Sequence, residues 1–202
     1  MTSSEEIIEQ LQALATDRPP VCFGTCPIAE KDFALYYGKG NDARQISLHT
    51  ASDAELEHLA TSTDKATFGM NNLDVLDESY RKAGKMELDA FSVKLDVERA
   101  GILDRVKNDL LDRKGFRKGV HCEMYKLNVY GQGCFFKAHK DTPRSDTMFG
   151  SLVIVFPTPH VGGALLLRHG GKEWTFDAAA QLAATPAPSV GYIASTATWS
   201  TR

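Results

Sequence analysis

Residues Tyr125–Arg144 read YKLNVYGQGCFFKAHKDTPR and mark a change of pattern in this 202-residue chain. Short runs rich in aromatic and branched residues begin here, separated by glycine and proline, as is typical of strands joined by tight turns. Such spacing predicts a β-sandwich or a β-barrel. The predicted strands cover residues 122–130, 134–139, 150–156, 164–169 and 172–176.

His139 and Asp141 stand two residues apart in this stretch. Because successive side chains in a strand alternate between faces, the two side chains point the same way and can reach one ion. An imidazole and a carboxylate suit a divalent metal, and non-haem Fe(II) oxygenases use two histidines and one carboxylate on one face of the iron. The tripeptide His-x-Asp is not specific on its own, because it arises often by chance.

The neighbouring sequence extends the pattern well beyond the tripeptide. Residues Phe149–Pro157 read FGSLVIVFP, and residues Gly162–Gly171 read GGALLLRHGG. Together with Tyr125–Arg144, they closely resemble the prolyl-4-hydroxylase-like branch of the iron(II)- and 2-oxoglutarate-dependent dioxygenases. The resemblance covers roughly the last eighty residues in detail, and residues 74–85 are similar to one subgroup of that branch.

This resemblance implies an α+β fold built on a double-stranded β-helix, a jelly-roll barrel, incomplete at its C-terminus and buttressed by N-terminal helices. We expect one structural domain. Residues 1–118 would provide the helical flank and support helices, and residues 119–202 the partial jelly-roll core.

The resemblance also implies roles for individual residues. His139 and Asp141 match the first two iron ligands, and Tyr130 matches a tyrosine that lies beside 2-oxoglutarate. The alternative for Tyr130 is aromatic packing inside a narrow barrel. Thr142 and Arg144 follow the ligand pair, where they either contact substrate or co-substrate or belong to an ordinary turn.

The other histidines have simpler explanations. His169 ends a predicted strand near the mouth of the barrel, but the family does not use that position for iron, and metal geometry tolerates only small displacements. We therefore do not expect His169 to replace a ligand. Surface positions are expected for His49, His58, His121 and His160.

The last residues depart from the family pattern. Family members continue past Ile193-Ala194 with a segment such as FYSDVEHEV, whose histidine is the third iron ligand, and later supply a basic residue that binds the far carboxylate of 2-oxoglutarate. Here Ser195–Arg202 read STATWSTR. Codons chosen for the family segment encode STATWSTR once the first base is dropped, so we expect a one-base change of frame ahead of Ser195.

The expected activity has two versions. In its complete form, the protein would be a dioxygenase with Fe(II) as cofactor and 2-oxoglutarate as co-substrate, hydroxylating a C–H bond of a peptidyl or small-molecule substrate. With two protein ligands in place of three, metal binding and turnover would be weak or lost, and unpaired strand edges would reduce stability. The alternative is a catalytically inactive remnant or interaction domain. A cupin-type jelly roll would need more histidines near His139.

Helices are expected mainly before residue 119. Apolar residues at helical spacing predict helices over residues 5–15 and 95–113. Ser52 and Glu55 form a capping box for a helix that reaches about residue 60, and residues 74–83 predict another, ended by Gly84. Residues 178–187 are alanine-rich and fit either a small helix or a linker.

Composition sets the remaining bounds. Hydrophobic residues make up 43% and the net charge is −3, which gives no electrostatic reason to expect nucleic acid or anionic lipid as a partner. No apolar run has the length that a bilayer requires, and Met1–Leu14 lacks a secretory signal pattern. We expect a cytoplasmic protein, with the nucleus as the alternative. The cysteines have no CxxC spacing, which favours reduced thiols.

Overall fold

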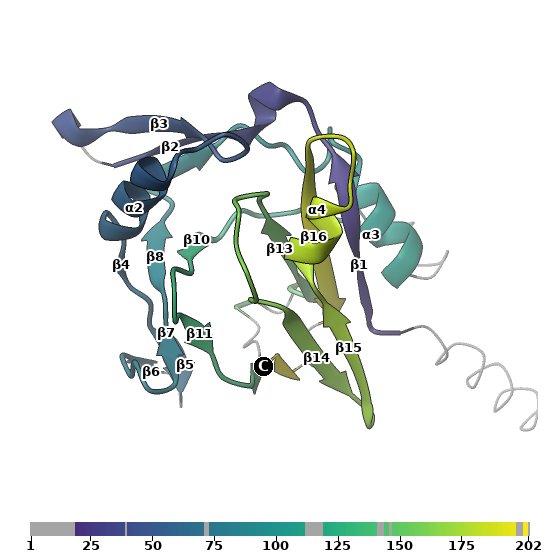
Figure 1. Ribbon diagram of the computed structural model, residues 1–202. Coiled ribbons are helices and arrows are strands. Elements are labelled where there is room, and N and C mark those ends of the chain that lie inside the picture. Colours follow the sequence, from purple (N-terminus) through teal and green to yellow (C-terminus); the bar gives the residue numbers. More distant parts are fainter. Residues whose placement is uncertain are drawn as a thin grey trace, which may run out of the picture.

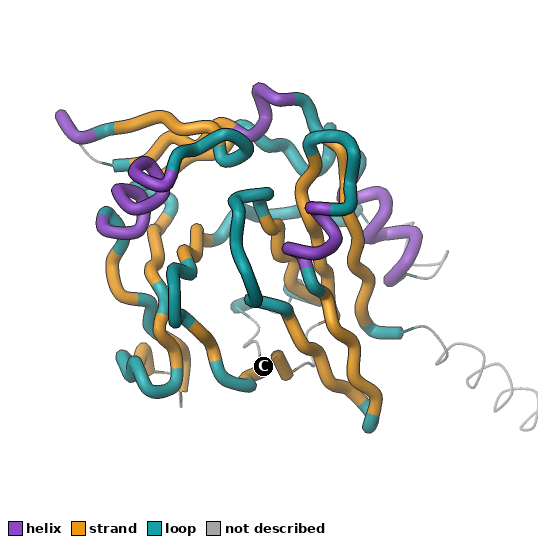
Figure 2. The backbone as a smooth tube through the Cα atoms, viewed as in Figure 1, coloured by secondary structure: helices purple, strands orange, loops and turns teal. Residues whose placement is uncertain are grey.

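The computed structural model describes residues 19–38, 40–70, 73–111, 119–140, 144–145, 147–196 and 200–201, with only the backbone for residues 70, 200 and 201. These residues form mostly β-strands in small antiparallel sheets, with few helices (Figures 1 and 2). The described strands do not close into a barrel. The helix expected over residues 5–15 falls outside the described residues.

The first sheet joins the two ends of the chain. Its strands are β1 (Val21–Pro27), β16 (Ser189–Thr196) and β13 (Gly150–Val155), in the order β1-β16-β13. Strand β16 lies in the centre, and its residues 189–194 are all buried. Helix α3 (Ile102–Leu110) packs on this sheet through Ile102 and Val106, so residues from both halves of the chain form one core. In Figure 1 the helix lies beside β1, on the outer side of the sheet.

The second sheet carries the histidine of interest. It has the order β12-β17-β14-β15 and is formed by β12 (His139–Lys140), β17 (Ser200–Thr201), β14 (Leu165–His169) and β15 (Lys172–Phe176). From β12 the chain crosses to β13 in the first sheet, returns to the second for the hairpin of β14 and β15, crosses again to β16 and returns to β17. One buried cluster of side chains joins the sheets. Its members are Val21, Leu167, Phe176, Ala178 and Ile193.

The remaining strands form four small sheets or ladders, mostly on the side of the molecule opposite β1, β13 and β16 (Figure 1). Strand β8 (Gly84–Glu87) lies between β4 (Asp64–Lys65) and β10 (Lys126–Val129), and β2 (Ala34–Tyr37) lies between β3 (Arg44–Ser47) and β9 (Phe91–Val93). Two further pairs complete the set. They are β7 (Arg81–Lys82) with β11 (Phe135–Phe136), and β5 (Phe68–Met70) with β6 (Leu73–Val75).

Helix α2 (Asp53–Thr61) confirms the capping-box prediction. The Ser52 hydroxyl oxygen accepts a hydrogen bond from the Glu55 amide, and the Glu55 carboxylate accepts one from the Ser52 amide at 2.8 Å. Each group thereby satisfies a backbone donor that the first turn of a helix leaves unpaired. The alanine-rich segment, for which the sequence allowed a small helix or a linker, forms helix α4 (Ala178–Ala183). The Asp177 side chain caps its first turn.

Two of the helix predictions need correction. Residues 74–83 contain the end of β6, a turn and β7 instead of a helix, because the Asp77 carboxylate accepts a hydrogen bond from the Ser79 amide and Arg81 pairs with Phe136. Helix α3 is shorter than predicted. Gly101 precedes it with a positive φ of 74°, a conformation that suits glycine and ends any helical turn before it.

The strand predictions after residue 119 agree better with the structure. Strands β13, β14 and β15 match their predicted ranges to within a residue, whereas β10 is shorter than predicted and residues 134–139 divide between β11 and β12. The expectation of a mainly helical flank was wrong for the described residues up to 93, which hold nine strands, β1 to β9, one α-helix and two 3-10 helices, η1 (Glu30–Phe33) and η2 (Gly40–Asp42). Among the described residues, none of the helices is long and apolar enough to span a bilayer.

Candidate metal centre

His139 lies at the start of β12, and its position follows from two ladders. Its register partner on β17 is Thr201, and Thr201 in turn pairs with Leu167 on β14. Directly opposed residues of antiparallel strands project from the same face of a sheet. His139 is therefore on the face of the buried Leu167, which is 2% exposed and packs between the two sheets.

The hydrogen bond of the His139 ring defines which nitrogen can bind a cation. Nδ1 lies 2.9 Å from the carbonyl oxygen of Lys137. A carbonyl oxygen only accepts, so Nδ1 must carry the hydrogen and donate it. In the neutral ring the lone pair then resides on Nε2, and a backbone carbonyl bonded to the other nitrogen is the usual support of a metal-binding histidine.

An aromatic ring fixes the plane of His139. Phe136 on β11 stacks against it, with ring centroids 3.5 Å apart and an angle of 19° between the planes. The same Phe136 ring contacts the Arg81 guanidinium, whose central carbon lies 4.4 Å from the ring centroid. Tyr80 meets Phe136 edge to face at 6.0 Å and donates a hydrogen bond to the Ala138 carbonyl at 2.6 Å. These contacts hold the short segment between β11 and β12 in place.

The other predicted site residues have mixed outcomes. Asp141 and Thr142 lie outside the described residues, so the joint placement of His139 and Asp141 stays a prediction. Tyr130 follows β10, ahead of the turn at residues 131–133, and is 49% exposed, so it does not pack inside a core as the alternative required. Its role beside 2-oxoglutarate also stays a prediction. Arg144 stacks over the Tyr125 ring at 3.5 Å.

The described residues provide only part of a metal centre. Nowhere among them do three or more His, Cys, Asp or Glu side chains come together, and Asp141 is not in that set. His139 itself fits a borderline divalent metal such as Fe(II) through Nε2. His169 lies on β14, which β17 separates from β12. It is also two residues beyond Leu167, the residue of β14 that is in register with His139. At about 5 Å per strand this separation is too large for one ion.

Sequence reasoning missed Arg81 and Phe136. Arg81 was assigned to a helix, and an arginine is usually solvated, so nothing local distinguished it. Phe136 carried one usable signal, because it lies three residues before His139 in a stretch predicted to be strand. The partners of Arg81 are far away in sequence and only the fold brings them together.

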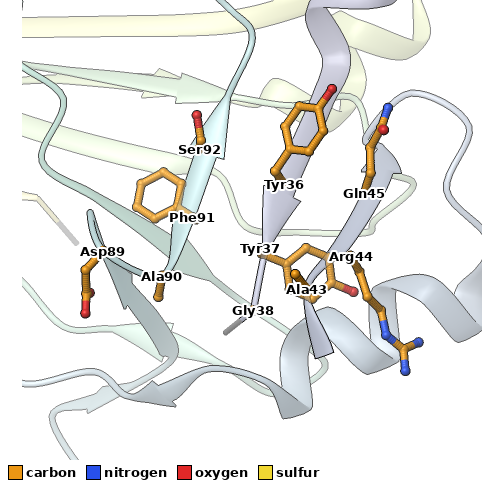
Figure 3. Close-up of a pocket in the computed structure, with 10 residues that line it drawn as sticks. All are labelled: Tyr36, Tyr37, Gly38, Ala43, Arg44, Gln45, Asp89, Ala90, Phe91 and Ser92. Carbon is orange, nitrogen blue, oxygen red and sulfur yellow. The ribbon is translucent and has the colours of Figure 1, made fainter. Parts of the chain in front are cut away.

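One pocket in the described surface lies on strands other than that of His139. A pocket of about 480 Å³ opens along β2, β3 and β9 (Figure 3). Behind it, the Tyr37 hydroxyl lies 3.0 Å from Nδ1 of His58 on α2. His58 was expected at the surface and is instead half-buried by this contact. The lining residues are Tyr36, Tyr37, Gly38, Ala43, Arg44, Gln45, Asp89, Ala90, Phe91 and Ser92.

No model of a known protein family, no characterised protein and no solved structure matched this chain when each was compared with it.

Proposed function

We propose that this chain has the fold of an iron(II)- and 2-oxoglutarate-dependent dioxygenase of the prolyl-4-hydroxylase-like branch, with His139 and Asp141 as protein ligands of the metal. The observation that supports it most is the hydrogen bond from His139 Nδ1 to the Lys137 carbonyl. This bond leaves the Nε2 lone pair on a ring that lies on the buried face of its sheet.

The strand order supports the jelly-roll part of the proposal. Two antiparallel sheets share a buried cluster of side chains, and between β12 and β17 the chain crosses repeatedly from one sheet to the other, with the β14–β15 hairpin staying in one sheet. Repeated crossing between two sheets that share a core is the pattern that jelly rolls produce. In such a barrel His139 would project inward, toward the space that the two sheets enclose.

The residues of this chain would divide the work as follows. Bound Fe(II), with 2-oxoglutarate and O2, would supply the chemistry that hydroxylates a C–H bond. Nε2 of His139 and the carboxylate of Asp141 would hold the metal. The Lys137 carbonyl orients the imidazole, and Phe136 covers one side of it and excludes water there. The substrate would be a peptide or a small molecule.

A second function, a non-catalytic relative with the same fold, is favoured by the register of β17. The residue that lies opposite His139 on this strand is Thr201, and its neighbour Ser200 lies opposite Lys140. A neutral hydroxyl is a weaker ligand for Fe(II) than an imidazole. This copy would then bind metal weakly and turn over little or no 2-oxoglutarate.

Replacement of His139 by alanine tests the metal assignment. Mn(II) is a suitable probe because it takes the same nitrogen and carboxylate ligands and is observed directly by electron paramagnetic resonance. We expect His139→Ala to reduce Mn(II) affinity by about tenfold or more, since second-shell changes alone cost that much. His160→Ala is a matched control, because Nδ1 of His160 lies 2.7 Å from the Thr158 carbonyl in the same way but in an exposed turn.

Equal Mn(II) binding by the parent protein and by both variants would rule out the metal site at His139. The two functions are separated by a second measurement on the parent protein loaded with Fe(II). Release of succinate from 2-oxoglutarate indicates a working dioxygenase. Metal binding that depends on His139 without succinate release indicates the non-catalytic relative.

A further inference from the structure

Arg81 on β7 is a charged residue in a place where charges are rare. Only 6% of its surface is exposed, and it is the only charged residue among the buried residues of the described chain. A guanidinium keeps its charge in the protein interior. Burial of a charge is costly unless an opposite charge or several hydrogen bonds compensate it.

The compensation that the fold itself provides is incomplete. Nη1 of Arg81 donates to the Thr67 carbonyl at 2.7 Å, and Nη2 donates to the Asn128 side-chain oxygen at 2.8 Å. Both acceptors are neutral. Nε is buried and has no hydrogen-bond partner within the described structure. The guanidinium therefore retains donors and its full positive charge.

The carboxylates nearby do not neutralise this charge. In the described part of the chain, no Asp or Glu forms an ion pair with Arg81. Lys85 shares Thr67 with Arg81 and lies opposite Asn128 in the ladder, and its ammonium group already pairs with Glu87 at 3.0 Å. The surroundings of Arg81 thus contain a second cation and a carboxylate that is already paired.

Arg81 and His139 both contact the ring of Phe136. Phe136 stacks on His139 at 3.5 Å and contacts the Arg81 guanidinium at 4.4 Å. Phe136 and Arg81 are direct partners in the ladder of β11 and β7, so this spacing is built into the backbone register. A ligand bound beside His139 would lie within reach of the uncompensated charge.

We propose that Arg81 binds the carboxylate of a ligand that occupies the site beside His139. A carboxylate matches the two parallel N–H donors of Nε and the adjacent Nη, and charge-assisted pairs of this kind are about twice as strong as neutral ones. Asn128 is exposed, and its amide can turn toward water to open the guanidinium edge. The inference rests on the proposed function for the position of the site, but the carboxylate would bind without metal.

The experiment is calorimetric titration of the metal-free protein with 2-oxoglutarate and with succinate, using neutral succinamide as the control ligand. We expect both dicarboxylates to bind and succinamide not to bind. Arg81→Met should weaken the binding by about tenfold or more, because one charge-assisted hydrogen-bonded pair is lost. Arg81→Lys, which keeps the charge but loses the fork, should bind with intermediate affinity.

Arg168→Met is the matched control. Arg168 is an exposed arginine on β14 that pairs with Glu173 at 2.6 Å, so its removal should leave dicarboxylate binding unchanged. If Arg81→Met does not fold, the parent protein still gives an answer. The parent protein is labelled with nitrogen-15 at arginine, and the Arg81 Nε–H resonance is the one missing from the spectrum of Arg81→Lys. This resonance should shift when succinate is added and should not shift when succinamide is added.

Addition of Mn(II) separates the two sources of the carboxylate. Suppose that Mn(II) raises the affinity of the protein for 2-oxoglutarate but not for succinate, and that this increase requires His139. The ligand is then the co-substrate. If both bind with unchanged affinity, the carboxylate belongs to a substrate. Binding of neither dicarboxylate, or binding that Arg81→Met leaves unchanged, overturns the inference even where Mn(II) binding to His139 holds.

Discussion

At the scale of single residues, Cys22 shows how burial changes chemistry. It is one of four free cysteines, lies on β1 and is 8% exposed, within the core formed with α3 and β16. Burial raises the pKa of its thiol from 9.0 to about 11, with a further contribution from the Asp109 carboxylate, against the hydrogen bond with the Ala194 backbone. The thiol is therefore inert near neutral pH.

This pKa shift predicts an alkaline loss of stability. The thiol of Cys22 holds its proton more tightly in the folded protein than in the unfolded chain. Its contribution to the free energy of unfolding is therefore fully present below pH 9 and is lost as the pH rises through about 11. Urea unfolding at pH 8, 10 and 11 should show the free energy of unfolding decreasing over this range in the parent. Cys22→Ala should show a smaller decrease. A remainder should persist, because burial also raises the pKa of Tyr192.

Cys134→Ala is the control, since Cys134 is half-buried and lies outside this core. It should keep the parent's pH dependence. A Cys22→Ala variant that loses stability between pH 8 and 11 as steeply as the parent would show that another group is responsible.

Residues of the candidate site differ in how well sequence predicts them. The strand position of His139 was predictable, because alternation and the glycine turn at residues 131–133 are local signals. Arg81 was not predictable, because its partner Asn128 lies 47 residues further along the chain. Side chains whose environment depends on such distant segments leave no local pattern in the sequence.

The same distinction holds at the scale of elements. Helix α2 was predicted correctly, since its capping groups Ser52 and Glu55 are three residues apart. Residues 74–83 were predicted as a helix but contain the end of β6, a turn and β7. Tyr80 donates a hydrogen bond to the Ala138 carbonyl between β11 and β12. Arg81 pairs with Phe136 on β11 and donates to Asn128 on β10. Tertiary contacts override a weak local preference there. Strands of two or three residues, such as β7, are also too short to show alternation.

The register of β17 yields a prediction at this scale. In the backbone ladder Thr201 lies opposite His139, and directly opposed positions of antiparallel strands belong to the same face of a sheet. Thr201→His should therefore add an imidazole to the site and raise Mn(II) affinity by about tenfold or more, since it completes the set of two histidines and a carboxylate. Titration followed by electron paramagnetic resonance measures the change.

Ser200→His provides the control for this prediction. Ser200 lies opposite Lys140, and adjacent residues of a strand face opposite sides. Its imidazole should leave Mn(II) affinity close to that of the parent. Equal gains from both variants, or a gain from Thr201→His that survives His139→Ala, would contradict the register-based site.

At the scale of the whole molecule, stability rests on separate clusters of buried side chains. One joins α3 to the sheet of β1 and β16, and another lies beneath β2, β3, β8 and β9. Phe156, directly after β13, packs against both. The sequence could not show this division, because each cluster combines segments from distant parts of the chain.

Phe156→Ala should therefore uncouple these two clusters. Loss of a partly buried ring should lower the free energy of unfolding by about 2 kcal/mol, less than a fully buried phenylalanine would cost. Hydrogen exchange measured by mass spectrometry should also change. Exchange in β2, β3 and β9 should speed up more than exchange in β1 and β16, because the shared contact no longer couples the opening of the two clusters.

Phe149→Ala, which removes a ring that is 43% exposed, should leave the free energy of unfolding and the exchange rates nearly unchanged. If Phe156→Ala speeds exchange equally in all five strands, the two clusters unfold as one unit, and the ring contributes only its own packing.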